Sequence, residues 1–158
     1  MKKLLIIGLI LFTSMNLKAQ EIGAGIAFFK PEDGTSLTGI NLFGKKEIKE
    51  KIRVGINLSY FSETGYSIMP ITGLVEYKFN KEKLSPFSGL EAGLYRSAIS
   101  IFGITASTTN LGFAPVAGLD YTLTDKLNAN LTAKYHYIMF EGGSSTALGF
   151  NIGIAYKL

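Results

Sequence analysis

The chain has 158 residues, no cysteine and a formal net charge of +4, and 47% of its residues are hydrophobic. Three of the 16 basic residues, Lys2, Lys3 and Lys18, lie in the first 19 positions, which leaves 13 basic and 12 acidic residues and no reason to expect nucleic-acid binding. The lack of cysteine excludes disulfide bonds, thiolate metal sites and a lipoprotein anchor, which needs a cysteine directly after the leader.

Residues 1–19 have the organisation of a secretory signal peptide. Lys2 and Lys3 precede an apolar run at residues 4–12, and a more polar stretch then ends at Ala19. The apolar run is shorter than the roughly 20 residues that a membrane-spanning helix needs. We therefore expect a cleaved leader at residues 1–19 and a single domain at residues 20–158.

From residue 21 onward, apolar side chains recur at every second position, which is the period of a β-strand. In one such segment Ile52, Val54 and Ile56 alternate with Arg53 and Gly55. Turn residues divide the pattern into eight predicted strands, at residues 21–29, 37–43, 52–61, 68–79, 86–96, 109–123, 129–140 and 146–158.

The predicted connections between these strands fall into two alternating classes. Those at 44–51, 80–85 and 124–128 contain lysine, whereas those at 30–36, 62–67, 97–108 and 141–145 are richer in Gly, Ser and Thr. In an up-and-down barrel whose termini both face the periplasm, the first class would form the periplasmic turns and the second the extracellular loops.

The two faces of the predicted strands indicate a bilayer rather than water around the barrel. Most predicted strands reach the roughly 9–11 residues that cross a bilayer, and their non-apolar face is small and polar instead of bulky. We therefore predict an all-β, eight-stranded antiparallel up-and-down transmembrane β-barrel. A soluble lipocalin-like ligand-binding barrel is the alternative that would invert the faces. The residues expected to face lipid are Leu111, Leu119, Ile152 and Ile154, and those expected to face the lumen include Asn57, Asp120 and Asn151.

Aromatic residues gather near both ends of the predicted strands, as they do at the two interfaces of a membrane. The expected periplasmic girdle contains Tyr77, Phe79, Tyr121 and Tyr156, and the expected outer girdle contains Tyr60, Phe61, Tyr137 and Phe140.

The C-terminal residues Asn151, Gly153, Tyr156 and Leu158 resemble the C-terminal signal of outer-membrane barrels, although that signal usually ends in an aromatic residue. With the leader and the strand pattern, the chain resembles the small bacterial outer-membrane β-barrel domain family, which includes OmpX and the OmpA barrel domain. The resemblance implies an address in the outer membrane, contact with its lipid, assembly by the barrel-assembly machinery through the last strand, and a monomer.

Charged residues that the alternation places inward are the candidate lumen network, because isolated charges in a narrow bore are costly and should pair. Such a network closes the bore as a plug, or opens as a small porin or gated channel. The predicted members are Arg53, Glu76, Glu91, Asp120, Lys134, His136 and Lys157.

No enzymatic or cofactor motif emerges from the sequence. An outer-membrane lipid hydrolase with a serine nucleophile two residues from its histidine is a weaker alternative, because Ile138 stands two residues after His136, the single histidine. No phosphate-binding glycine loop or calcium loop is recognisable, so we expect no cofactor, no metal and no enzyme activity.

The extracellular loops are therefore the expected seat of function, in a structural or surface-binding role of the adhesion type. The segments 62–67 and 97–108 are the two candidates. The second carries apolar residues among Ser and Thr, so it could extend its strands as an exposed edge and bind an extracellular protein or another surface ligand by strand addition. Its candidate contact residues are Ile99, Ile101, Phe102 and Ile104. The alternative is that these residues continue the barrel wall.

Overall fold

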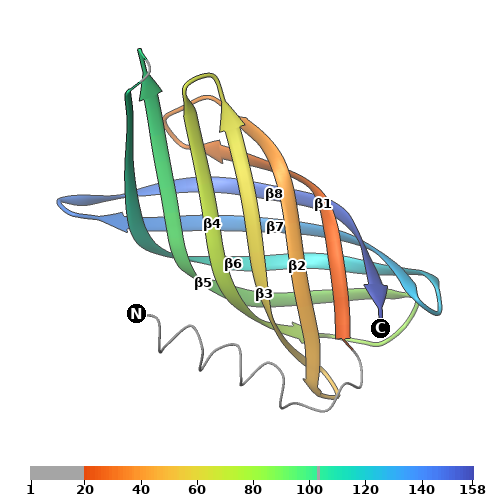
Figure 1. Ribbon diagram of the computed structural model, residues 1–158. Helices are drawn as coiled ribbons and strands as arrows, with labels where there is room; N and C mark the ends of the chain where they lie inside the picture. Colours follow the sequence, from red (N-terminus) through yellow and green to blue (C-terminus); the bar gives the residue numbers. More distant parts are fainter. Residues whose placement is uncertain (1–19, 103) are drawn as a thin grey trace, which may run out of the picture.

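The computed structural model describes residues 20–102 and 104–158, and the expected leader at residues 1–19 lies outside this range. Eight antiparallel strands form a closed barrel in chain order, which confirms the predicted fold class (Figure 1). The strands are β1 (Gln20–Pro31), β2 (Leu37–Lys49), β3 (Ile52–Glu63), β4 (Tyr66–Lys78), β5 (Leu84–Ile101), β6 (Ile104–Thr124), β7 (Leu127–Phe140) and β8 (Gly143–Lys157). None of the described residues belongs to a helix that could span a membrane.

The ring closes where β1 pairs with β8, over a register that runs from Glu21 opposite Lys157 to Pro31 opposite Ala147. Gln20 and Leu158 therefore lie at one end of the barrel, which we call the terminal end (Figure 1). The turns β2–β3, β4–β5 and β6–β7 lie at this end, and the other four connections lie at the opposite, far end.

The wall of the barrel is apolar outside and mostly polar inside. Leu111, Leu119, Ile152 and Ile154 are exposed on the outer surface, whereas Asn57, Asp120 and Asn151 are buried in the bore. These faces match the alternation in the sequence and are the reverse of those in a soluble lipocalin-like barrel, whose bulky apolar residues would point inward.

Two predicted connections are largely strand. The predicted turn at residues 44–51 is wrong, because β2 continues to Lys49; Lys45 points into the bore, where an ion pair with Glu76 stabilises its charge. The predicted bounds of the loop at residues 97–108 are also wrong, since β5 extends to Ile101 and β6 begins at Ile104. In water-soluble proteins, lysine and small polar residues usually indicate turns. In the wall of this barrel, the same residue types occur within strands.

The outer aromatic girdle needs one correction. Tyr60 is exposed on the wall, but its neighbour Phe61 is 2% exposed and lies inside the bore, because adjacent strand residues point to opposite faces. At the terminal end Tyr77 and Tyr121 are exposed on the wall, with Lys51 and Lys83 placed over their respective rings.

Inward-facing glycines leave room for aromatic rings that point into the bore. A Cβ atom built on Gly112 would lie 2.7 Å from Cε2 of Tyr95, which is closer than packed carbon atoms approach. The narrow bore therefore alternates glycine with large side chains, as small barrels filled by side chains require.

A substitution at Gly112 tests this packing. We expect Gly112→Val to lower the free energy of unfolding by about 1–3 kcal/mol, because the new side chain overpacks the bore against Tyr95. Urea titration of the barrel in detergent micelles measures the change. Ala117→Val, on the outer face of the same strand, is the matched control and should leave the unfolding midpoint nearly unchanged; equal losses would contradict the assigned faces.

Candidate functional site

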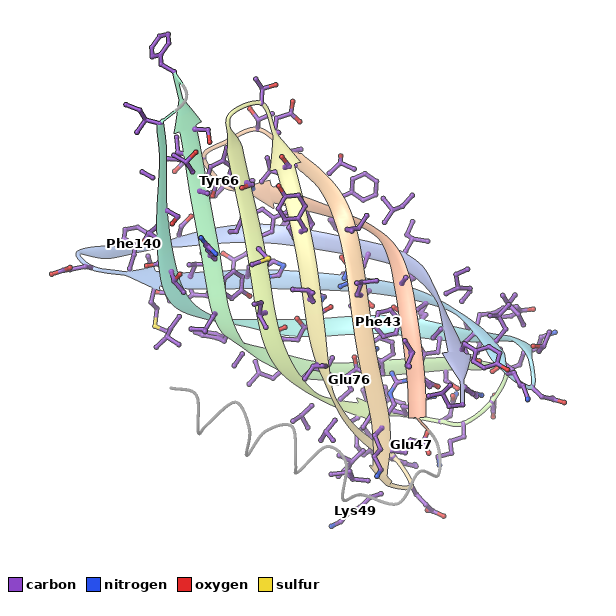
Figure 2. All side chains as sticks on the ribbon, viewed as in Figure 1. Phe43, Glu47, Lys49, Tyr66, Glu76 and Phe140 are labelled. Atoms are coloured by element: carbon purple, nitrogen blue, oxygen red, sulfur yellow. The ribbon has the colours of Figure 1, made fainter. Side chains whose placement is uncertain are left out.

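The bore is filled by three layers of side chains between the terminal end and the far end. An ion-pair cluster around Arg53 lies nearest the terminal end, hydrogen-bonded polar residues fill the middle, and an apolar layer closes the far end. Figure 2 labels Phe43 of β2 and Glu76 of β4, which are both buried, and Glu47 and Lys49 near the terminal end of β2. The side chains of each layer come from several strands, so a layer forms only when the barrel is closed.

Arg53, which is 1% exposed, is the centre of the first layer. Its Nη2 lies 2.6 Å from Glu76 Oε2, and its Nη1 lies 2.5 Å from Asp120 Oδ2 and 3.3 Å from Glu21 Oε2. Lys45 Nζ adds a contact of 2.9 Å to Glu76 Oε1, and Lys78 Nζ lies 3.4 Å from Asp120 Oδ2. Three cations and three carboxylates thus balance, which offsets the cost of burying each charge.

The middle layer is a second, separate charge pair within an amide and hydroxyl network. Lys134 Nζ donates to Glu91 Oε1 at 2.7 Å, and Asn57 and Thr72 donate to Glu91 Oε2 at 3.1 and 3.0 Å. The space open to the centre of a water molecule at this level measures about 10 Å³. That is roughly enough for one water and too small for a continuous water column.

The apolar layer closes the bore toward the far end. The Phe29 and Phe61 rings pack with their centroids 5.2 Å apart, and Tyr95 Oη lies 2.8 Å from His136 Nδ1. The buried residues of this layer are Ala27, Phe29, Leu37, Phe61, Ile68, Tyr95, Ile138 and Ala147. His136 is thus held inside the barrel, on the face of β7 that points away from the surrounding lipid.

The structure divides the predicted lumen residues into groups. Arg53, Glu76 and Asp120 meet in one cluster, Glu91 and Lys134 form a second, and His136 belongs to the apolar layer. Lys157 is half-buried and lines a hollow of about 290 Å³ open at the terminal end; it makes no ion pair within the described residues.

Sequence reasoning missed three members of the network, Glu21, Lys45 and Lys78. Lys78 lies two residues after Glu76 in the same predicted strand, and Glu21 begins the first predicted strand. The alternation of faces could therefore have predicted that both side chains point inward. Lys45 was missed because it fell in a predicted turn.

In the predicted C-terminal signal the four residues lie on both faces of the last strand. Asn151 and Gly153 point into the bore, whereas Tyr156 and Leu158 are exposed outside it.

The β5–β6 hairpin extends beyond the strands on both sides of it. β5 and β6 remain paired up to Ile101 opposite Ile104, whereas the β4–β5 pairing ends at Tyr66 opposite Ile99. Pairing between β6 and β7 begins only at Leu111 opposite Met139. Figure 1 shows this hairpin rising past the neighbouring β3–β4 turn.

One edge of the hairpin is consequently without a neighbouring strand. Within the described residues, β6 has a pairing partner only on its β5 side from Ile104 to Asn110. Phe102 at the tip is fully exposed and has a positive φ of 50°, and Ile104 is 76% exposed. Ile99 is also exposed. For Ile101 the structure describes only the backbone pairing.

The ion-pair cluster yields a stability prediction with an internal control. We expect Asp120→Asn to cost about 3–5 kcal/mol of unfolding free energy, because it leaves the buried Arg53 charge undercompensated. Glu47→Gln breaks the exposed Lys81–Glu47 pair, of 2.9 Å, and should cost less than about 1 kcal/mol. Urea unfolding of both variants in the same lipid vesicles measures the difference, and similar costs would mean that the bore is water-filled.

Comparison with known proteins identifies the family. The family model described as "Outer membrane protein beta-barrel domain" matches residues 4–157. No curated protein sequence gives a significant match. Among solved structures, Neisserial surface protein A (NspA) matches with a TM-score of 0.79 at 15% sequence identity. The aligned region covers 88% of this chain and 97% of the NspA chain.

Two further structures share the fold. The attachment invasion locus protein Ail of Yersinia pestis matches with a TM-score of 0.63 at 17% sequence identity, and the aligned region covers 89% of this chain and 99% of the Ail chain. The outer membrane enzyme PagL has a TM-score of 0.52 at 14% identity, with 85% and 97% covered. The chain therefore belongs to the outer-membrane β-barrel domain family and is a protein of the bacterial outer membrane.

Proposed function

We propose that this protein is a surface-binding, adhesion-type protein of the outer membrane and that the β5–β6 hairpin is its binding element. In the expected orientation both termini face the periplasm, so the far end of the barrel and the hairpin are extracellular. The observation that carries the proposal is the edge of β6 from Ile104 to Asn110, which extends beyond β7 and has no neighbouring strand there among the residues that the structure describes.

The chemistry of this edge favours pairing with another extended chain. A strand edge presents a row of backbone N–H and C=O groups, and natural edges are usually protected by lysine, proline or a bulge. Residues 104–110 contain no charged residue and no proline. The exposed Phe102 and Ile104 add apolar surface beside the row, so backbone hydrogen bonds would supply affinity and these side chains would supply selectivity.

The contents of the bore support a binding role over the small-porin alternative. The Arg53 cluster, the Lys134–Glu91 pair and the apolar layer occupy successive levels, and the cavity at the middle level has a volume of about 10 Å³ open to the centre of a water molecule. An ion would have to break buried pairs and then cross an apolar layer, which is costly at both levels.

A non-enzymatic role is part of the proposal, although PagL, one of the proteins with this fold, is an enzyme. His136 lies inside the barrel, where its Nδ1 contacts Tyr95 Oη. Ile138 follows it on the same face and packs in the apolar layer. In this position the imidazole contacts neither lipid nor bulk water, whereas a lipid hydrolase needs its base at the substrate.

Export and assembly complete the proposal. Residues 1–19 would be the cleaved leader, and the barrel-assembly machinery would bind the last strand. In support, β8 is the strand that pairs with β1 and closes the ring, with Tyr156 opposite Ile22. Because inward Asn151 and Gly153 lie on the opposite face of the strand from outward Tyr156, the signal has one polar and one apolar face.

Shortening the hairpin tests the binding role. We expect replacement of residues 99–106 by Asn-Gly, a favoured two-residue turn that joins the paired residues Ala98 and Ser107, to leave the heat-modifiable gel mobility of the folded barrel intact and to reduce adhesion of expressing cells to matrix protein. Loss of heat modifiability would show that the hairpin belongs to the essential wall, and unchanged adhesion would contradict the proposal.

A point substitution separates the strand edge from the rest of the hairpin. Ser107→Lys places a charge in the middle of the edge and should reduce adhesion by roughly tenfold if an added strand is excluded. Ser145→Lys, on the exposed end of the β7–β8 hairpin, is the matched control and should have no effect.

The closed bore predicts electrical behaviour. Purified protein in a planar bilayer should give no stable single-channel steps, because ion pairs and the apolar layer occupy the path. Persistent steps of defined size would favour the small porin or gated channel.

A further inference from the structure

The outer face of the barrel carries a hollow of about 250 Å³ at the far ends of β1, β7 and β8. In the ring, β8 lies between the other two strands (Figure 1). The lining of the hollow includes Lys30, Glu32, Tyr135, Thr146 and Leu148, none of which belongs to the β5–β6 hairpin. A ligand in this hollow would therefore bind independently of strand addition at β6.

The strand register places part of this lining on the lipid-facing side of the wall. Lys30 of β1 lies opposite Leu148 of β8, which lies opposite Tyr135 of β7. Leu148 and Tyr135 are each 46% exposed, and Lys30 is exposed as well. Phe29 and Ala147, which are adjacent to this row in the sequence, point into the bore instead. The three lining side chains therefore form one outward row across three strands.

Glu32 lies further from the centre of the membrane than this row. It comes two residues after Lys30, which is about 7 Å along the strand direction and on the same face. Its backbone N–H donates to the Thr146 carbonyl at 3.1 Å, so the pairing of β1 with β8 continues to this position. The Thr146 hydroxyl also donates to a carboxylate oxygen of Glu32. The two hydrogen bonds hold the carboxylate on the outer side of the Lys30 row.

The membrane side of the row is apolar. Phe28 lies opposite Phe150, and Ile26 lies opposite Ile152, between β1 and β8. All four side chains are exposed on the outside of the barrel. From the membrane toward the far end, this part of the wall therefore presents apolar groups, then an ammonium group, then a carboxylate.

Neither charge has an ionic partner in the part of the chain that the structure describes. The ion pairs there include neither Lys30 nor Glu32. A lysine on a lipid-facing wall is unfavourable in hydrocarbon, and its long side chain extends to the level of the lipid head groups, where opposite charges are available. At that level a phosphate would neutralise Lys30, and a cation further out would neutralise Glu32.

One class of lipid carries its groups in the matching order. Phosphatidylethanolamine has two acyl chains, then a phosphate, and then a primary ammonium group two carbon atoms further out. The phosphate can accept from Lys30 while the ammonium group donates to Glu32, and both hydrogen bonds are charge-assisted. Phosphatidylglycerol has no ammonium group, so its net negative head group would repel Glu32. Phosphatidylcholine has a cation, but that cation has no N–H donor.

We propose that this hollow is a binding site for a lipid with a phosphoethanolamine head group, in the leaflet at the far end of the barrel. Lys30 binds the phosphate, Glu32 binds the ammonium group, and Leu148 and Tyr135 contact the upper part of the acyl chains. The site selects its lipid by the order of charges along β1 rather than by net charge alone.

Native mass spectrometry of the purified barrel, released from detergent micelles, tests the proposal. The probes are phosphatidylethanolamine, phosphatidylcholine and phosphatidylglycerol with identical acyl chains, and the fraction of barrel that carries one lipid gives each affinity. We expect phosphatidylethanolamine to bind roughly tenfold more tightly than phosphatidylglycerol, with phosphatidylcholine between them. Equal affinities for the three lipids would overturn the proposal, because Lys30 would then contact phosphates without selection. Binding of free O-phosphoethanolamine as tightly as the lipid would also overturn it, because the apolar wall would then contribute nothing.

Two variants assign the selection to the two charges. Lys30→Gln should weaken the binding of phosphatidylethanolamine and of phosphatidylglycerol, each by roughly tenfold. Glu32→Gln should remove the preference for phosphatidylethanolamine over phosphatidylglycerol, because it removes the group that distinguishes them. Heat-modifiable gel mobility checks that each variant is folded.

The matched controls are Lys51→Gln, at the terminal end, and Glu63→Gln, in the β3–β4 hairpin, since both residues are exposed. Both controls should leave the three affinities unchanged. Equal weakening by Lys51→Gln and Lys30→Gln, or an unchanged preference in Glu32→Gln, would overturn the assignment to this hollow.

Discussion

In hydrocarbon no water is present to pair with the backbone, so each N–H and C=O group in the membrane needs a partner within the protein. The eight strands meet this requirement only because β1 pairs with β8 and leaves no open edge at bilayer depth. The arrangement of side chains follows from this closure. The outside must be apolar, while the inside is a bore of fixed width that the remaining side chains must fill.

Filling that bore with polar groups requires mutual neutralisation. Arg53 balances part of the charge of three carboxylates from three other strands, and Lys45 and Lys78 supply the remainder. The middle layer contains a single ion pair, Lys134 and Glu91, and the layer at the far end consists of packed apolar side chains. The polarity of the interior therefore decreases from the terminal end to the far end, where the β5–β6 hairpin extends past the wall.

Period-two alternation in the sequence was sufficient for the strand number, the faces and the inward direction of Arg53, Glu76 and Asp120. It was insufficient where a residue type is common both in connections and in the strands of a barrel. Lysine at position 45 and serine and threonine between positions 97 and 108 resembled connections, although Lys45 has a carboxylate partner and the second segment is paired strand. Partners such as Arg53 and Asp120 are 67 residues apart, and their contact depends on strand tilt and ring closure, which local periodicity does not contain.

The way in which the Arg53 cluster spans the sequence has a consequence for the kinetics of folding. Glu21 belongs to the first strand and Asp120 to the sixth, so Arg53 cannot collect its partners from any short contiguous piece of the chain. A half-inserted sheet would expose unpaired charges and two open edges to lipid, and both are unfavourable. Such distant contacts form slowly, because the chain must lose much of its freedom before they stabilise it. We therefore expect insertion and closure to occur as one cooperative event, with the barrier set by the meeting of β1 and β8.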